Sequence, residues 1–410
     1  MNYLTGFLFI NFSKIEPLST SNIEYLTIDT CPPNRLYRLF MLSPQLKYLN
    51  IRDMWNDYGR SKLDSISLFA PKVMALSMTI EYYLCDDFHL LLKQFSQLKQ
   101  LSLKARGEDF TNGRKWENFI CSYLPRLEEF RFVCNDILIA TTMNQVIESF
   151  QTDFWTKQHQ WYIVCDFHVD RDETYVYTVP YMFNEFRLCP ISTFESKTTV
   201  PSSSTLLAHA YDNVQQLCLI LSDTLFHRHY SNVETLVLCQ VVENETIGHN
   251  IQALINLSSV KHLTIDCDIK STCFLHLLQQ TTMSLSSLTF GNSCPLLTLT
   301  SKFSDRAICE YLNQRITSLN LSHYTFSDDC MKQFYCVFSH LQQLHIWIYK
   351  WYDLIELLNE MKHLTCATIS CEEKFNVGED IHKWLKERTR LKNFTYQFDN
   401  YSMKLWIGSV

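Results

Sequence analysis

An apolar pattern of the form L-x-x-L-x-L, in which Ile, Val or Phe can replace Leu, recurs about a dozen times along the chain. Alternation of apolar and polar positions is typical of a β-strand with one buried face. The copies begin at Ile23, Leu46, Val73, Leu98 and Leu127, and after a gap at Val214, Val233, Val260, Leu285, Ile316, Leu341, Leu364 and Leu391. Apart from the gap, successive copies start roughly 19 to 31 residues apart, which indicates an internal repeat.

Most intervals between copies carry apolar residues at helical spacing, which predicts helices over 86–97, 116–125, 327–340, 353–363 and 379–390. Asp86 and Asp87 suit a helix N-terminus, and Pro125 fits a helix end. A unit of strand, loop, helix and loop cannot bury its apolar residues alone, so the units must stack. The predicted fold class is therefore α/β: an irregular solenoid with parallel strands on a concave face and helices on the convex face.

The gap between the two groups of copies predicts an inserted β-hairpin. Two aromatic and β-branched runs, 150–167 and 174–183, flank an acidic turn, and a Ser-, Thr- and Pro-rich stretch over 189–209 is typical of an exposed loop. We therefore expect N-terminal repeats with a capping segment over 1–134, a hairpin and loop insert over 135–213, and C-terminal repeats with a cap over 214–410. All three would form one continuous solenoid.

The repeat resembles that of leucine-rich repeat proteins with helical repeats, a class that includes the F-box/leucine-rich-repeat adaptors and the ribonuclease-inhibitor-like proteins. The aromatic segment of the insert also resembles divergent F-box domain-containing proteins. The class places Asn or Cys three residues after the last apolar position, where it stabilises a turn. Cys31 and Asn135 fit this rule, but Met54, Tyr324 and Tyr349 do not. Because unmet backbone groups in a turn are costly, we expect uneven curvature.

No F-box is visible, since the chain begins almost directly with repeat material and contains no helical segment opening with L-P-x-E-[IL]. The F-box was lost or omitted, or the protein works without one. The apolar start, MNYLTGFLFI, is interpreted as a capping strand or as a truncated beginning. The resemblance implies a substrate receptor of an SCF-type ubiquitin ligase that holds its target on the concave face, with a Skp1-type linker only if an F-box lies upstream. The alternative is a stand-alone binding or inhibitor protein.

Composition narrows the partners and the compartment. The formal net charge of -7 argues against nucleic acid, which requires a basic surface. No apolar run approaches the length of a membrane span. The 16 cysteines are scattered without a C-x-x-C pair, which favours thiols in a reducing compartment. We therefore expect an intracellular protein, cytoplasmic or nuclear, with a protein partner.

Catalytic, cofactor and metal motifs are absent from the sequence. The stretch from Gly107 to Lys115 only faintly resembles a phosphate loop, because its glycine spacing is too long and Arg114 stands where Lys is needed. No H-E-x-x-H helix or G-x-S-x-G elbow occurs. Paired carboxylates such as Asp328 and Asp329 are explained by helix capping. We therefore expect no enzyme activity, no cofactor and no metal.

Residues between the apolar positions of each copy should point out of the concave sheet. In the middle of the chain they are small and polar, as at Cys218, Thr235 and Thr264. Aromatic residues dominate interface energy, so we expect partner contacts where they gather. The candidates are Gln343, His345, Trp347, Tyr349 and Asn320 near the C-terminus, and Tyr25, Tyr48 and Arg52 near the N-terminus. An alternative is that Trp347 or Trp351 packs under the next loop.

Overall fold

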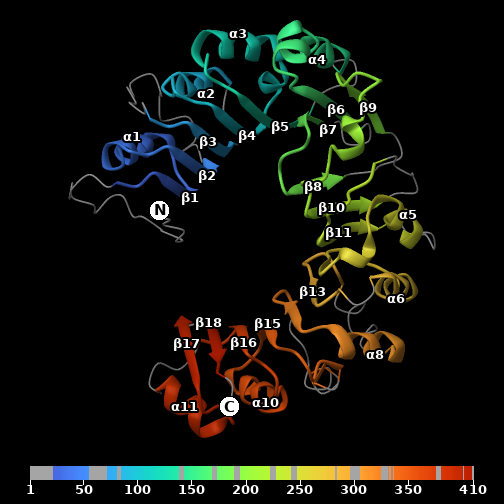
Figure 1. The fold of residues 1–410 in the computed structure, drawn as a ribbon. Coiled ribbons are helices and arrows are strands. Elements are labelled where there is room, and N and C mark those ends of the chain that lie inside the picture. Colours follow the sequence, from blue (N-terminus) through green and yellow to red (C-terminus); the bar gives the residue numbers. More distant parts are fainter. Residues whose placement is uncertain are drawn as a thin grey trace. The chain divides into compact units, whose positions relative to one another are not determined.

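The computed structural model describes residues 22–54, 72–80, 85–137, 143–168, 173–188, 194–221, 228–241, 247–281, 284–295, 305–324, 331, 334–335, 337–374, 380–399 and 401–408. The chain divides into two compact units. Unit 1 comprises Met1–Met182 and Thr193–Tyr211, and unit 2 comprises Phe183–Ser192 and Asp212–Val410. Each unit is mixed α/β, with one largely parallel sheet and helices along one side of that sheet (Figure 1).

Unit 1 holds an eight-stranded sheet whose strand order is β1-β2-β3-β4-β5-β7-β6-β9. The first five strands are parallel, and the pairings of β7, β6 and β9 are antiparallel. The strands are β1 (Tyr25–Thr30), β2 (Tyr48–Met54), β3 (Ala75–Ile80), β4 (Gln100–Arg106), β5 (Glu129–Ile137), β6 (Tyr162–His168), β7 (Glu173–Val179) and β9 (Phe194–Thr198). The helices are α1 (Pro33–Leu42), α2 (Cys85–Leu92), η2 (Glu108–Thr111), α3 (Gly113–Tyr123), α4 (Met143–Ser149), η4 (Phe154–Gln158) and η6 (Leu206–His209).

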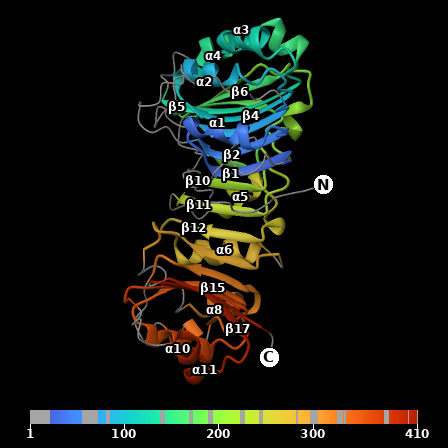
Figure 2. The same cartoon turned by 90° about the vertical axis from the view of Figure 1, so that its left-hand side faces the viewer.

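Unit 2 holds a ten-stranded sheet whose strand order is β17-β18-β16-β15-β14-β13-β12-β11-β10-β8. Its strands are β8 (Glu185–Leu188), β10 (Gln216–Leu221), β11 (Thr235–Val241), β12 (His262–Ile265), β13 (Ser287–Phe290), β14 (Ser318–Leu321), β15 (Gln343–Ile348), β16 (Cys366–Cys371), β17 (Phe394–Asp399) and β18 (Ser402–Ile407). Its helices include α5 (Ile247–Leu254), η7 (Leu257–Ser259), α6 (Ser271–Gln280), α8 (Arg306–Arg315), α10 (Trp351–Glu360) and α11 (Ile381–Arg388). The strands of unit 2 follow one another as a ladder in Figure 2.

The repeat fixes the strand register through one recurring hydrogen-bond pattern. The carbonyl of the second residue of a copy accepts from two successive amides of the next copy. In unit 1, Glu24 O accepts from Lys47 N at 2.9 Å and from Tyr48 N at 3.0 Å. In unit 2, Glu234 O accepts from Lys261 N at 2.8 Å and from His262 N at 3.0 Å. The apolar positions of each copy therefore meet their counterparts in the next strand and form the core.

The same hydrogen-bond pattern shows a copy that the sequence analysis missed. Asn184 O accepts from Gln215 N and Gln216 N, both at 2.8 Å, and β8 pairs in parallel with β10. Phe183, Phe186 and Leu188 occupy the apolar positions of this copy. It escaped notice because Phe replaces the first two leucines inside the predicted insert.

The predicted hairpin is present as β6 and β7, which pair antiparallel and extend the sheet of unit 1 beyond β5. Two parts of that prediction were wrong. The beginning of its first run is not a strand, because Phe154–Gln158 form one turn of π-helix in which Trp155 is fully buried. Part of the predicted loop is not a loop, because Phe194–Thr198 form β9 against β6.

Both faces of the hairpin are covered. Ile163 and Cys165 of β6 face the core, while Val164 and Asp166 on the opposite face are also buried. Tyr211, which follows η6, reaches the second face and shares a hydrogen bond of 2.8 Å with the hydroxyl of Tyr177. The predicted boundaries 1–134, 135–213 and 214–410 stay a prediction, although the strands within 135–213 are divided between the two sheets.

The final copy departs from the parallel arrangement. β17 pairs antiparallel with β18, and β18 lies between β16 and β17. The turn explains this, because the carboxylate of Asp399 accepts from the amides of Tyr401 at 2.9 Å and Ser402 at 2.8 Å. Such a short turn joins antiparallel strands, whereas parallel strands need a long crossover.

The turns after the strands are stabilised by groups other than the expected Asn. Tyr324, which does not fit the Asn or Cys rule, donates from its hydroxyl to Cys294 O at 2.6 Å, in the turn that follows the preceding strand β13. Thiols donate to turn carbonyls in the same way at two other places. Cys134 Sγ donates to Gly107 O and Cys371 Sγ donates to Tyr349 O, both at 3.4 Å. These donors satisfy turn carbonyls that would otherwise be costly to bury.

Candidate functional site

The predicted C-terminal residues lie mainly on one strand of unit 2. Leu344, Ile346 and Ile348 of β15 are buried in the core, so the alternate residues Gln343, His345 and Trp347 point to the opposite face. We call the face of each sheet opposite its helices the helix-free face. Trp347 is 39% exposed there, and Gln343 is exposed as well.

Neighbouring strands add residues to this face in register. His345 pairs with Asn320 on β14 and with Thr368 on β16, and Thr368 pairs in turn with Lys404 on β18. Two residues before Thr368 on β16, Cys366 pairs with Gln343 of β15 on one side and with Trp406 of β18 on the other. Trp406 is also 39% exposed, and Lys404 Nζ lies 5.3 Å from the centre of its ring. We define the C-terminal aromatic surface as Gln343, His345, Trp347, Lys404 and Trp406.

Lys404 and Trp406 were not among the predicted site residues. The signal was present, since S-M-K-L-W-I alternates as a half-buried strand does. The repeat does not point to this strand, because the strand lies outside the repeat and follows its last copy. The hairpin turn at Asp399 returns the chain to the sheet and so brings Trp406 to this surface.

His345 supplies a neutral polar group to the C-terminal aromatic surface. Its ring is half-buried, and burial lowers the pKa of the imidazole below its usual value of 6.5. The neighbouring His323 lowers that pKa further by charge repulsion. At neutral pH the ring is therefore uncharged, and it offers one hydrogen-bond donor and one acceptor.

The two aromatic residues that follow β15 have different surroundings. The strand ends at Ile348, so Tyr349 lies in the bend beyond it, 49% exposed. Trp351 is only 5% exposed, donates from Nε1 to Glu373 O at 2.9 Å and packs on Phe398 with ring centres 5.7 Å apart. The alternative of packing under a later segment therefore holds for Trp351, whereas Trp347 stays open to solvent.

The predicted N-terminal residues lie in unit 1. Tyr25 and Tyr48 pair in register, and their rings stack almost parallel with centres 4.4 Å apart. Arg52 Nη1 lies 3.0 Å from Asp29 Oδ1 in an exposed ion pair. These groups thus contact one another across β1 and β2. Of the eight predicted residues, five belong to unit 2 and three to unit 1.

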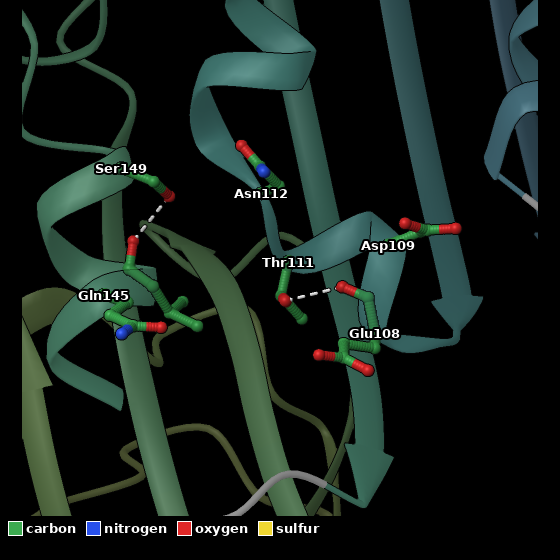
Figure 3. A pocket seen from close by; sticks show the side chains of 7 residues that line it. Glu108, Asp109, Thr111, Asn112, Gln145 and Ser149 are labelled. Atoms are coloured by element: carbon green, nitrogen blue, oxygen red, sulfur yellow. Dashed lines mark hydrogen bonds between the residues drawn. The ribbon is translucent and has the colours of Figure 1, made fainter. Parts of the chain in front are cut away.

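Unit 1 also contains an open polar cavity of about 330 Å³ between η2, the start of α3 and α4 (Figure 3). Glu108, Asp109, Thr111, Asn112, Gln145, Val146 and Ser149 line it. It includes the loop that faintly resembles a phosphate loop. Two carboxylates line the cavity, and the first amide of α3, Gly113 N, already donates to Ser149 Oγ at 2.8 Å. An anion would be repelled here, so the cavity does not suit a phosphate.

Metal-binding clusters and membrane-spanning helices are absent from the part of the chain that the structure describes. Among the residues that the structure describes, no three His, Cys, Asp or Glu side chains are grouped so that they could hold a metal ion. Over the same residues, no helix combines the length and apolar character needed to cross a bilayer.

Comparison with known proteins adds little. The fold defines a mixed α/β protein with two largely parallel sheets. No protein-family model and no curated protein matches the chain. One solved structure, described as the crystal structure of the Rad7 and Elc1 complex in yeast, aligns over 81% of this chain and 81% of its own, with 12% sequence identity and a TM-score of 0.32. Similarity of this size carries no inference, so the function has to be argued from the surface itself.

Proposed function

We propose that the chain is a non-enzymatic protein-recognition scaffold whose strands and helices build an irregular leucine-rich-repeat solenoid. Its protein partner binds the helix-free face of unit 2 at the C-terminal aromatic surface. The observation that carries this proposal is the presence of Trp347 and Trp406 on one face of one sheet, each 39% exposed. Tryptophan is the residue type most enriched among those that dominate binding energy at protein interfaces.

The surroundings of the two indoles support binding. Their strands are held by continuous backbone ladders, so little conformational freedom is lost when a partner docks. Gln343 and His345 add neutral donors and acceptors beside the rings. Lys404 adds the positive charge of this surface, above the Trp406 ring. The row of His345, Thr368 and Lys404 lies between the two indoles, so the surface offers two separate aromatic anchors with polar groups between them.

The test is capture of partner proteins from a cell lysate by the immobilised chain. The variant Trp347→Ala/Trp406→Ala should lose specific bands that the unchanged chain retains, because both anchors are removed. Tyr352→Ala is the matched control, since Tyr352 is 62% exposed but lies on helix α10. Circular dichroism should be the same for all three proteins. Undiminished capture by the double variant would contradict the proposed surface.

The finer role that we propose is substrate receptor of an SCF-type ubiquitin ligase. It is supported by the resemblance of the repeats and of the insert to F-box/leucine-rich-repeat proteins. The test is co-purification of a Skp1-type linker with the chain and with the full product of its gene. If neither brings down the linker while partner capture persists, the protein is a stand-alone binding or inhibitor protein instead.

A further inference from the structure

Two cysteines lie side by side on the helix-free face of unit 2. Cys218 belongs to β10 and Cys239 to β11, and their Sγ atoms are 3.0 Å apart. Both are thiols in the structure, and both side chains are half-buried. Their neighbours Leu217, Leu219 and Leu238 face the core, so the two thiols share the opposite face.

An irregularity in the strand register brings the two thiols together. Leu219 pairs with Leu238, but the next residue, Ile220, pairs with Gln240. Cys239 is therefore the extra residue of a β-bulge. Bulges re-aim the side chain at which they occur. The bulge thus explains how Cys239 approaches a cysteine that is opposite Val237 in the ladder.

A third thiol close to Cys239 is poorly suited to reaction. Cys267, which follows β12, is close enough to Cys239 for their charges to interact, but burial raises the pKa of Cys267 to about 12. Only the thiolate attacks a disulfide, so Cys267 stays unreactive at neutral pH. The more exposed Cys218 and Cys239 remain as the reacting pair.

We propose that Cys218 and Cys239 are a redox modification site, which closes to an intramolecular disulfide by exchange with a low-molecular-weight disulfide such as oxidised glutathione. One protein thiolate attacks the small disulfide, forms a mixed disulfide and releases one small thiolate. The second protein thiolate then attacks the protein sulfur of the mixed disulfide and releases the other. The two protons lost by the cysteines end on the two small thiols, which are the reduced products.

The geometry requires little movement for this step. A disulfide bond is about 2.05 Å long, so the sulfurs at 3.0 Å must approach by roughly 1 Å. The product would link β10 to β11 at the bulge, where the ladder is interrupted. Compartments that keep most thiols reduced use such bonds mainly in redox sensing.

The experiment uses the intact chain, equilibrated without oxygen in mixtures of reduced and oxidised glutathione and then quenched by alkylation. Trypsin cleavage after Lys197, Arg228 and Lys261 separates the two cysteines into peptides 198–228 and 229–261, each with a single cysteine. As the oxidised fraction rises, we expect these two peptides to appear linked, lighter by two hydrogen atoms and separable by dithiothreitol.

Two variants complete the test. Cys218→Ser should abolish the linked pair and leave Cys239 alkylated or carrying glutathione. Cys366→Ser, at a half-buried position on the same face of the sheet, should leave the yield unchanged. The proposal is overturned if the unchanged chain shows the two peptides only as singly alkylated or glutathione-bearing species. Predominant linkage of either peptide to another cysteine would overturn it too.

Discussion

The buried imidazole of His89 should make unit 1 sensitive to mild acid. His89 lies in α2, is 6% exposed and stacks on Phe119 with ring centres 4.0 Å apart. The edge of Trp116 closes another side at 4.9 Å. Burial in this aromatic site lowers the pKa of His89 to about 4, and the positive charge of Lys115 adds to the effect. The ring is therefore uncharged in the folded state at neutral pH.

The size of the effect follows from linkage between protonation and folding. In the unfolded chain the pKa of His89 is about 6.5. Between about pH 6.5 and pH 4 the unfolded state therefore binds a proton at His89 that the folded state does not bind. The contribution of His89 is fully present above pH 6.5. It is lost as the pH falls from about 6.5 to about 4, by about 3 kcal/mol in all. Between pH 7 and pH 5 the loss is about 2 kcal/mol.

The assay is urea unfolding at pH 7 and at pH 5. Each sample then receives a short pulse of a thiol-labelling reagent at one fixed pH, and the fraction of Cys134 that is labelled gives the fraction of unfolded chain. This thiol is fully buried in unit 1 and becomes reactive when unit 1 unfolds. His89→Phe cannot take up the proton, so its stability relative to the unchanged chain should rise by about 2 kcal/mol between pH 7 and pH 5. His363→Phe, at an exposed position, is the control. The reasoning is refuted if the relative stability of His89→Phe is the same at both pH values.

Two further substitutions probe the packing of unit 1. A Cβ atom at Gly113 would lie 2.6 Å from Ser149 O, so Gly113→Ala should destabilise the unit by about 1–3 kcal/mol in the same assay. At Gly408 in unit 2 the nearest contact is an ordinary 3.4 Å, so Gly408→Ala should be nearly neutral in urea unfolding of the whole chain followed by circular dichroism. The hydroxyl of Tyr177 donates to the buried carboxylate of Asp166 at 2.7 Å, so Tyr177→Phe should cost about 1–3 kcal/mol.

Each of these substitutions has an outcome that contradicts its basis. If Gly113→Ala unfolds at the same urea concentration as the unchanged chain, α3 and α4 are not packed as closely as the structure shows. For Tyr177→Phe the control is Tyr175→Phe, whose hydroxyl lies 3.5 Å from Glu173 Oε2 and is only part-buried. Equal losses of stability in the two tyrosine variants would show that the buried hydrogen bond to Asp166 contributes no more to the free energy of unfolding than the part-buried one to Glu173.

The strands were predictable because their apolar positions repeat. A copy such as Leu98 to Leu103 carries its signal in side-chain type alone, and the backbone ladder then follows. The copy at Phe183 was lost because aromatic residues replaced leucine within a segment of different composition. The bond from the Tyr324 hydroxyl to Cys294 O could not be predicted, because it joins residues 30 positions apart that only the pairing of successive copies brings together.

The candidate site was predictable only in part, for the same physical reason. Alternation along one strand identifies the side of the sheet that Trp347 occupies. It does not identify its neighbours, because Trp406 arrives through a turn built on Asp399. Likewise Cys218 could be placed on the outward face of its strand. Its approach to Cys239 depends on a β-bulge, which the apolar and polar pattern of the sequence does not predict.

The proposed function is tested most directly by chemical labelling of the unchanged chain, with and without its captured partner bound. Photochemical or radical labelling should modify Trp347, Trp406 and Tyr352 in the isolated protein, since all three are exposed. With the partner bound, we expect labelling of Trp347 and Trp406 to fall several-fold while labelling of Tyr352 on α10 stays the same. Unchanged labelling of both tryptophans at saturating partner would contradict binding at the C-terminal aromatic surface.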